Sequence, residues 1–198
     1  MKKRDQSYHH GDLRAALLQA ATEVIEEVGV ASLSLREVAR RAGVSHGAPA
    51  HHFRDKAGLL TELAILGFAA FATALEAARD GAGSDPHRRL GEVGCAYVRF
   101  AVQHPAHFDV MFRPGVVDEQ DKRLVQASTA SYQVLLGCVQ QAVVGTEHDV
   151  NTAALRAWSM AHGFATLWLA GGPRLPDVAG QPDLEVLLAQ IFLPEGGC

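Results

Sequence analysis

Histidine and cysteine are the residues of this chain whose side chains could coordinate a metal ion or carry out catalysis. The ten histidines include two adjacent pairs, His9–His10 and His51–His52. Neighbouring residues on a helix point about 100° apart, so neither pair can hold one metal ion from a single helix face. Cys138 and His162 are the only nucleophile and base that we can pair, and no catalytic motif surrounds either residue. The sequence therefore predicts no metal site, no cofactor and no enzymatic activity.

The cysteines and the apolar segments bear on the compartment in which the chain works. Cys95, Cys138 and Cys198 are odd in number and widely spaced, which is not typical of a disulfide framework. The basic start, Met1–Arg4, is not followed by the apolar run of a signal peptide. The longest nearly pure apolar stretch, Leu63–Leu75, has 13 residues, whereas a membrane-spanning helix needs about 20. We expect a cytoplasmic protein that does not enter the membrane.

Positive charge is concentrated in a short part of the chain. The net charge of the whole sequence is -4, which disfavours a simple polyanion binder. Residues 1–60, however, contain nine Lys or Arg and seven Asp or Glu, so their net charge is +2 and the remainder carries −6. From Arg36 to Lys56 there are five basic and two acidic residues, with three histidines among them. This charge is compatible with a solvated surface or with a nucleic-acid contact.

The elements that must position these residues are helices. Apolar residues recur three and four positions apart, and no run alternates with the period of a strand, so we predict an all-α protein with about nine helices. In the first helix the predicted buried stripe includes Val28, with Gly29 as its C-terminal stop; in the fourth it includes Leu66 and Ala70. The predicted helices lie near residues 13–28, 35–42, 45–53, 57–79, 90–103, 106–112, 125–143, 155–169 and 184–191, with a loop over 170–183.

The second and third helices have the lengths and the turn of a helix-turn-helix. Ser34 and Glu37 form the Ser-x-x-Glu pattern of a capping box, which begins the first of the two. Gly43 lies in the turn, where a positive φ is needed. Ser45 is the predicted N-cap of the next helix, which puts Pro49 at the fourth helical position. This last helix is short and rich in histidine, alanine and glycine, a composition that suits insertion into a DNA major groove about 12 Å wide.

From about Leu13 to Leu63 the chain resembles the DNA-binding domain of the TetR family of transcriptional regulators. The matching residues are Ser34–Ala39, Ala42–Ser45, His52–Phe53, Asp55–Lys56 and Leu59–Leu60. Further along, Trp158–Gly163 is similar to the Trp-x-x-x-His-Gly signature of the WHG class of TetR C-terminal domains. The resemblance implies a homodimer with a helix-turn-helix DNA-binding domain over 1–56 and an effector-binding and dimerisation domain over 57–198.

The resemblance also implies which residues contact DNA. Arg36 would reach a base edge or a nearby phosphate, while His52 and Lys56 would contact phosphates. At Ala50 the chain departs from the family, because many members carry there a Tyr that binds a phosphate; His51 or His52 could substitute for it. The predicted DNA-binding residues are Ser34, Arg36, Ser45, His46, Gly47, Ala48, His51, His52 and Lys56.

The aromatic residues of the C-terminal part have two interpretations. Most of them fit a simple hydrophobic core, whereas some could line an apolar cavity for an unknown small-molecule effector, with Tyr132 or His162 as a polar group. The predicted ligand-binding residues are Tyr97, Phe100, Phe108, Met111, Tyr132, Trp158 and His162. The family resemblance implies that residues 151–169 and 184–193 form the homodimer interface.

Taken together, the sequence predicts a ligand-responsive regulator, and we expect a repressor that binds a pseudo-palindromic operator in double-stranded DNA. The two recognition helices of the dimer would read half-sites about one DNA turn apart, ~34–36 Å. An alternative is a ligand-sequestering or protein-interaction protein that has this fold without specific operator binding. A small helical hydrolase is a third class, but it would depend on Cys138 and His162.

Overall fold

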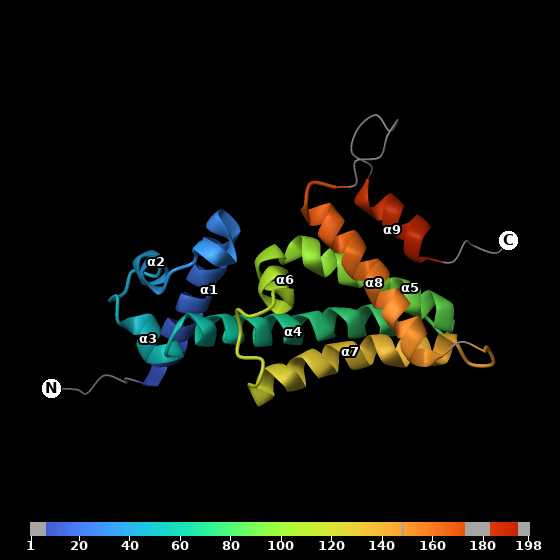
Figure 1. Cartoon of the computed structure of the whole chain (residues 1–198), viewed down its shortest axis with the longest axis horizontal. Coiled ribbons are helices and arrows are strands. Elements are labelled where there is room, and N and C mark those ends of the chain that lie inside the picture. Colours follow the sequence, from blue (N-terminus) through green and yellow to red (C-terminus); the bar gives the residue numbers. More distant parts are fainter. Residues whose placement is uncertain (1–6, 148, 173–182, 194–198) are drawn as a thin grey trace. The chain divides into compact units, whose positions relative to one another are not determined.

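The computed structural model describes residues 7–147, 149–172 and 183–193, which form nine α-helices without any strand (Figure 1). The predicted all-α fold is therefore confirmed. The predicted loop over 170–183 lies for the most part outside the described residues. The helices are α1 (Ser7–Ser32), α2 (Leu35–Arg41), α3 (Ala48–Phe53), α4 (Lys56–Gly81), α5 (Pro86–Gln103), α6 (Pro105–Phe112), α7 (Lys122–Ala142), α8 (Val150–Leu169) and α9 (Leu184–Phe192).

The helices belong to two compact units. The first unit comprises the chain up to Gly67 together with Ala106–Val125, and the second comprises Phe68–Pro105 together with the chain from Gln126 onward. Both α4 and α7 are therefore shared, because each begins in the first unit and ends in the second. The division into a DNA-binding domain over 1–56 and an effector-binding and dimerisation domain over 57–198 stays a prediction.

The core of the first unit is formed where α1 packs against α2 and α2 packs against α3. Leu17, Ala21 and Val24 on α1 are buried, as are Val38 on α2 and Phe53 on α3. All of these positions carry apolar side chains at helical spacing, so the burial of one face of each short helix stabilises the whole arrangement. This core leaves the opposite faces of α2 and α3 to solvent.

Three positions of the predicted buried stripes are exposed, so these predictions are wrong. Val28 is 53% exposed, because the neighbouring Gly29 (φ 77°, ψ 162°) breaks the helical geometry of α1 there, as its predicted role as a stop implies. Leu66 is 46% exposed and Ala70 is also exposed. Gly67 faces inward instead: a Cβ at this position would lie 2.7 Å from Met111 Sδ on α6. The close approach of α6 thus fixes which side of α4 is buried.

By length and composition, α4 is the one helix among the described residues that could cross a membrane. This is weak support for a membrane span, because the core helix of a soluble protein passes the same test. The side chains of Leu59, Leu63, Phe68, Phe71 and Leu75 on α4 are buried inside the protein. The helix therefore has the character of a core element.

The second unit is organised around α5, which packs against both α8 and α9. Asp85 is the N-cap of α5, and its carboxylate accepts hydrogen bonds from the His87 and Arg88 amides. Near the other end of the helix, the Arg99 guanidinium binds Glu185 of α9 at 2.6 Å. This packing buries Tyr97 and leaves it facing α8.

Candidate nucleic-acid interface

The start of α2 is fixed by Ser34, which is extended and accepts a hydrogen bond from the Glu37 amide at 3.2 Å. This is one half of the predicted capping box. The Glu37 carboxylate binds the Arg40 guanidinium through bonds of 2.6 and 2.8 Å, and this pairing holds the pKa of Glu37 below its usual value. Arg40 is thus paired within its own helix, although it remains exposed to solvent.

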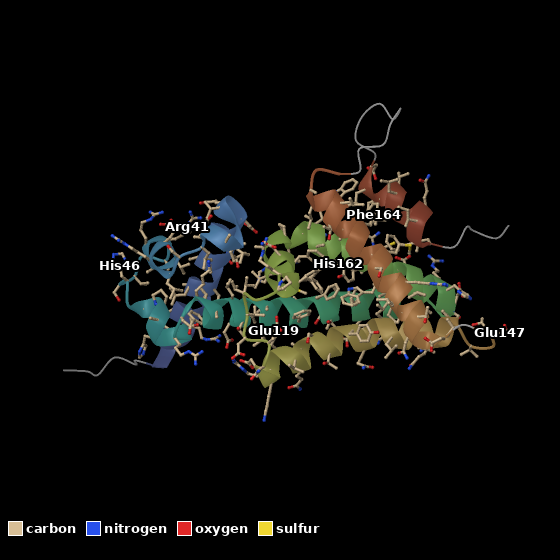
Figure 2. All side chains as sticks on the ribbon, viewed as in Figure 1. Arg41, His46, Glu119, Glu147, His162 and Phe164 are labelled. Atoms are coloured by element: carbon tan, nitrogen blue, oxygen red, sulfur yellow. The ribbon has the colours of Figure 1, made fainter. Side chains whose placement is uncertain are left out.

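Arg41 fastens α2 to α1. Its Nη1 donates to Glu27 Oε1 at 2.6 Å, and Glu23 and Glu37 lie within 3.9 Å of its guanidinium. The hydrogen bond with Arg41 lowers the pKa of Glu27, while the same bond raises the pKa of Arg41. The charge of Arg41 therefore serves the packing of the two helices (Figure 2).

The turn between α2 and α3 contains the predicted glycine, but the predicted N-cap of α3 is wrong. Gly43 has a φ of 69°, as expected for the turn. The prediction that Ser45 caps α3 is wrong: the Ser45 carbonyl accepts from the Ala48 amide at 3.0 Å in a turn, and Gly47 is the N-cap. Because α3 begins at Ala48, Pro49 lies in its first turn, where the missing N–H leaves no hydrogen bond unmade.

The predicted DNA-binding residues lie on the solvent side of this hairpin. Figure 2 shows His46 at the outer edge of the turn between α2 and α3. Ser34, Arg36, Ser45, His46, Gly47 and His51 are exposed, and Ala48, His52 and Lys56 are half-buried. Within the part of the chain that the structure describes, Arg36 has no ion-pair partner, so it is the cation on α2 that is available to a ligand.

Lys56 has a structural contact that the sequence did not indicate. Its ammonium donates to the Ala31 carbonyl at 3.1 Å, which joins the start of α4 to the last turn of α1. A positive group is favourable beside a helix C-terminus, where carbonyl groups lack partners within the helix. A substitution at Lys56 would therefore change this junction as well as any contact with a phosphate.

The connection from α3 to α4 is a strained γ-turn at Arg54. Arg54 has φ 69° and ψ −59°, and the Asp55 amide donates across it to the Phe53 carbonyl at 2.8 Å. The Asp55 carboxylate then accepts from the Gly58 amide at 2.8 Å, which lowers the pKa of Asp55 and caps α4. Gly58 allows this close approach, because a Cβ there would lie 2.0 Å from the Phe53 carbonyl oxygen. Nothing in the sequence indicates a positive φ at an arginine.

In the second unit, three of the predicted ligand-binding residues form a hydrogen-bonded group. Trp158 Nε1 donates to the Tyr97 hydroxyl at 3.2 Å, and this hydroxyl lies 2.8 Å from His162 Nδ1. Because the indole can only donate, the Tyr97 oxygen accepts from Trp158, and the same hydroxyl forms its second hydrogen bond with His162 Nδ1. Burial raises the pKa of Tyr97 and lowers that of His162. The group is therefore uncharged at neutral pH.

The remaining members of the predicted ligand-binding set are divided between the units. Tyr132 lies beside Trp158, with ring centroids 6.3 Å apart. Phe100 packs on Phe71 at 5.0 Å and borders a cavity of about 230 Å³, whose other lining residues include Arg99 and His104. Phe108 and Met111 are buried residues of α6, which belongs to the first unit.

Two family models match this chain. The model described as bacterial regulatory proteins of the tetR family matches residues 17–63, and the model described as the tetracyclin repressor-like C-terminal domain matches residues 90–190, about half of the chain. The chain belongs to the TetR family. This confirms the predicted resemblance and identifies the α2–α3 hairpin as part of the DNA-binding regulator fold.

Known proteins are similar to this chain to different extents. The HTH-type transcriptional regulator BetI of Escherichia coli is 51% identical over 47 residues, which are 24% of this chain and 24% of BetI. The match thus spans about a quarter of that curated relative. A protein of unknown function from Rhodococcus sp. RHA1 is 36% identical over 94% of both chains, with a TM-score of 0.77. FadR of Bacillus subtilis, solved in complex with stearoyl-CoA, is 18% identical, with a TM-score of 0.72 and coverage of 90% of this chain and 95% of FadR.

Proposed function

We propose that this TetR family member is a cytoplasmic, ligand-responsive repressor that binds a pseudo-palindromic operator as a homodimer. The observation that carries the proposal is the α2–α3 hairpin. Among the described residues, its outer side combines an unpaired Arg36 with exposed small residues, Gly47 at the start of the recognition helix α3 and Ala50 within it. Residues 1–56 would bind DNA, and residues 57–198 would bind the effector and form the dimer.

The hairpin supports the recognition of DNA bases because it combines long and short side chains. Arg36 can bind two acceptors of a guanine in the major groove, a contact worth ~1–3 kcal/mol of discrimination. Gly47 and Ala48 at the start of α3 leave room for a close approach to base edges, and the exposed His46 directly precedes them in the turn (Figure 2). We propose Ser34, Arg36, Ser45, His46, Gly47, Ala48, His51, His52 and Lys56 as the contacting set.

Exposed apolar side chains on α8 and α9 support the homodimer. Leu155, Met160 and Leu167 on α8 and Val186 and Ile191 on α9 are exposed large hydrophobic residues. Side chains of this kind are stabilised when a second surface removes them from water. Residues 151–169 and 184–193 of two copies, related by a twofold axis, would form this interface and space the two recognition helices on DNA.

The effector proposal is supported by the polar group within the aromatic residues of the second unit. Tyr97, Trp158 and His162 form a neutral set of hydrogen-bonding atoms, which favours a largely apolar ligand with few polar atoms. FadR, which shares the fold, was crystallised with an acyl-CoA. We propose that Phe100 and Tyr132, which lie in the same unit, complete the surroundings of such a ligand.

Selection of duplexes from a random-sequence library, followed by anisotropy titration, tests the operator proposal. We expect a selected pseudo-palindromic sequence whose affinity exceeds that of scrambled DNA by at least ~10³. Arg36→Ala should lower this affinity, and Arg88→Ala, which removes the same charge from α5, should leave it unchanged. Retention that is weak and equal for all sequences would overturn the proposal.

That last outcome would favour the alternative of a ligand-sequestering or protein-interaction protein. The observation that supports the alternative is Ala50, an exposed residue of α3 at the position where many members of the family carry a phosphate-binding Tyr. Ala50→Tyr separates the two possibilities. In a repressor it should strengthen binding to the selected duplex, because it adds a phosphate contact.

A further inference from the structure

The Glu62 carboxylate on α4 is held between two arginines from distant parts of the chain. Its Oε2 binds Arg14 of α1, and its Oε1 lies 2.7 Å from Arg123 Nη1 in the first turn of α7. The Glu62 side chain is only 14% exposed. Each oxygen of this partly buried carboxylate is thus committed to a different helix, which makes the geometry specific.

Arg14, which binds Glu62, also contacts the recognition helix α3. The Arg14 guanidinium lies over the Phe53 ring, 5.3 Å from its centroid. Phe53 is buried and is the last residue of α3, directly before the strained γ-turn at Arg54. A cation over an aromatic face is attractive. The position of Arg14 therefore constrains the C-terminal end of α3.

The Arg123 end is fixed to the segment that precedes α7. The Arg123 guanidinium binds Asp121 at 2.7 Å as well as Glu62, and these pairings raise the pKa of Arg123. Nearby, the buried Thr61 hydroxyl accepts from the Asp118 amide at 2.8 Å. The segment around 118–123 is thus bound to α4 at two consecutive residues, Thr61 and Glu62.

We propose that Glu62 is a positioning residue that couples the first turn of α7 to the recognition helix through Arg123, Glu62, Arg14 and Phe53. All four residues lie in the first unit, and α7 continues into the second unit. A displacement of the α7 N-terminus would remove Arg123 from Glu62 Oε1, so the Glu62 carboxylate could rotate. Arg14, which stays paired with Oε2, would then shift with it and loosen the end of α3 at Phe53. The consequence for operator affinity rests on the proposed function.

Amide hydrogen exchange of the full-length chain tests the coupling without DNA. In Arg123→Ala, the peptide over residues 46–55 should exchange roughly threefold faster, while peptides of α5 should be unchanged. Arg113→Ala is the matched control, because Arg113 is also a partly exposed arginine of the first unit, but its partner is Asp109. Equal exchange of residues 46–55 in the two variants would overturn the proposal.

A second comparison establishes whether Arg123 acts through Glu62. Glu62→Gln should also accelerate exchange of residues 46–55, and the double variant should match Glu62→Gln alone, because the same link is broken. If the accelerations of exchange in the two single variants multiply in the double variant, Arg123 and Glu62 act independently. That result would contradict the proposed coupling of Arg123 through Glu62. Circular dichroism of each variant verifies that the chain is folded.

The effect on DNA affinity is measured with the duplex that the wild-type chain selects from a random-sequence library. We expect Arg123→Ala to bind it several-fold more weakly than Arg113→Ala does, since a looser recognition helix loses pre-organisation. Equal affinity of the two variants would contradict the functional part of the proposed coupling. If the wild-type chain selects no duplex, the operator proposal fails, while the exchange data still decide the coupling.

Discussion

Replacing Arg54 by glycine should stabilise the chain, although it removes a side chain. Arg54 has a φ of 69°, a region in which residues other than glycine are strained. Strain of this kind costs about 1–3 kcal/mol. Glycine relieves it but enlarges the conformational freedom of the unfolded chain, which costs about 0.5–1 kcal/mol. The expected net gain in the free energy of unfolding is about 1 kcal/mol.

Arg54→Ala is the control that isolates the backbone contribution. It keeps a Cβ, and hence the strain, while it removes the guanidinium as the glycine variant does. The lost ion pair with Asp55 is common to both variants, and it is weak because the Arg54 side chain is 82% exposed. The difference between the two variants therefore measures the cost of the positive φ less the entropic cost of glycine.

Thermal unfolding followed by circular dichroism measures this difference. For a chain of this size, a gain of about 1 kcal/mol raises Tm by about 2–4 °C. We expect Arg54→Gly to melt above Arg54→Ala by this amount. If the glycine variant melts at the same temperature as the alanine variant or below it, the γ-turn is not strained and the reasoning is refuted.

Three further predictions concern DNA, assembly and pH. Arg36→Ala should reduce the slope of log affinity against log salt by about one, as in the loss of one phosphate contact, and an unchanged slope would exclude such a contact. Leu167→Asp, a charge in the exposed apolar face of α8, should convert a dimer into a monomer in light scattering, and a persistent dimer would place the interface elsewhere. Desolvation lowers the pKa of His162 in the folded state, so the unfolded chain takes up a proton first as the pH falls below about 6.5. The stabilisation by neutral His162 should thus be present above that pH and be lost below it. In urea titrations, the His162→Gln variant should lose less stability between pH 7 and pH 5 than the wild-type chain loses. An equal loss in the two proteins would assign the effect to other groups.

The order of the helices and several of their limits could be predicted because their signals are local. The predicted starts at 13, 90 and 155 are wrong, because α1, α5 and α8 begin at Ser7, Pro86 and Val150. Pro105 after His104 separates α5 from α6, and Asp183 caps α9, so each boundary is determined by residues within one turn of it. The predicted start of α3 is wrong for a related reason. Ser45 has the side chain of a good N-cap, but Pro49 is accommodated best in the first turn, and the proline determined the start.

Most of the candidate site's fine structure could not be predicted, because it depends on residues that are far apart in the sequence. Glu62 contacts Arg14 and Arg123, which are separated from it by 48 and 61 positions. Helical periodicity indicates that each of these residues lies on a helix, but it does not indicate which helix faces which. The same limit applies to Tyr97 and His162, whose contact is 65 positions apart.

The structure changes how the basic charge of the hairpin should be interpreted. Arg40, Arg41 and Arg54 are each bound to a carboxylate, and Lys56 is bound to a carbonyl. Long-range attraction to DNA should therefore be reduced, because the charges of the three paired arginines largely cancel before any phosphate approaches, whereas Lys56 keeps its charge. Arg40 and Arg54 are exposed, however, so a phosphate could replace their carboxylate partners at short range. Specific binding would then depend on close fit of the hairpin in the groove, and this explains how a chain with a net charge of -4 can act as a reader of DNA.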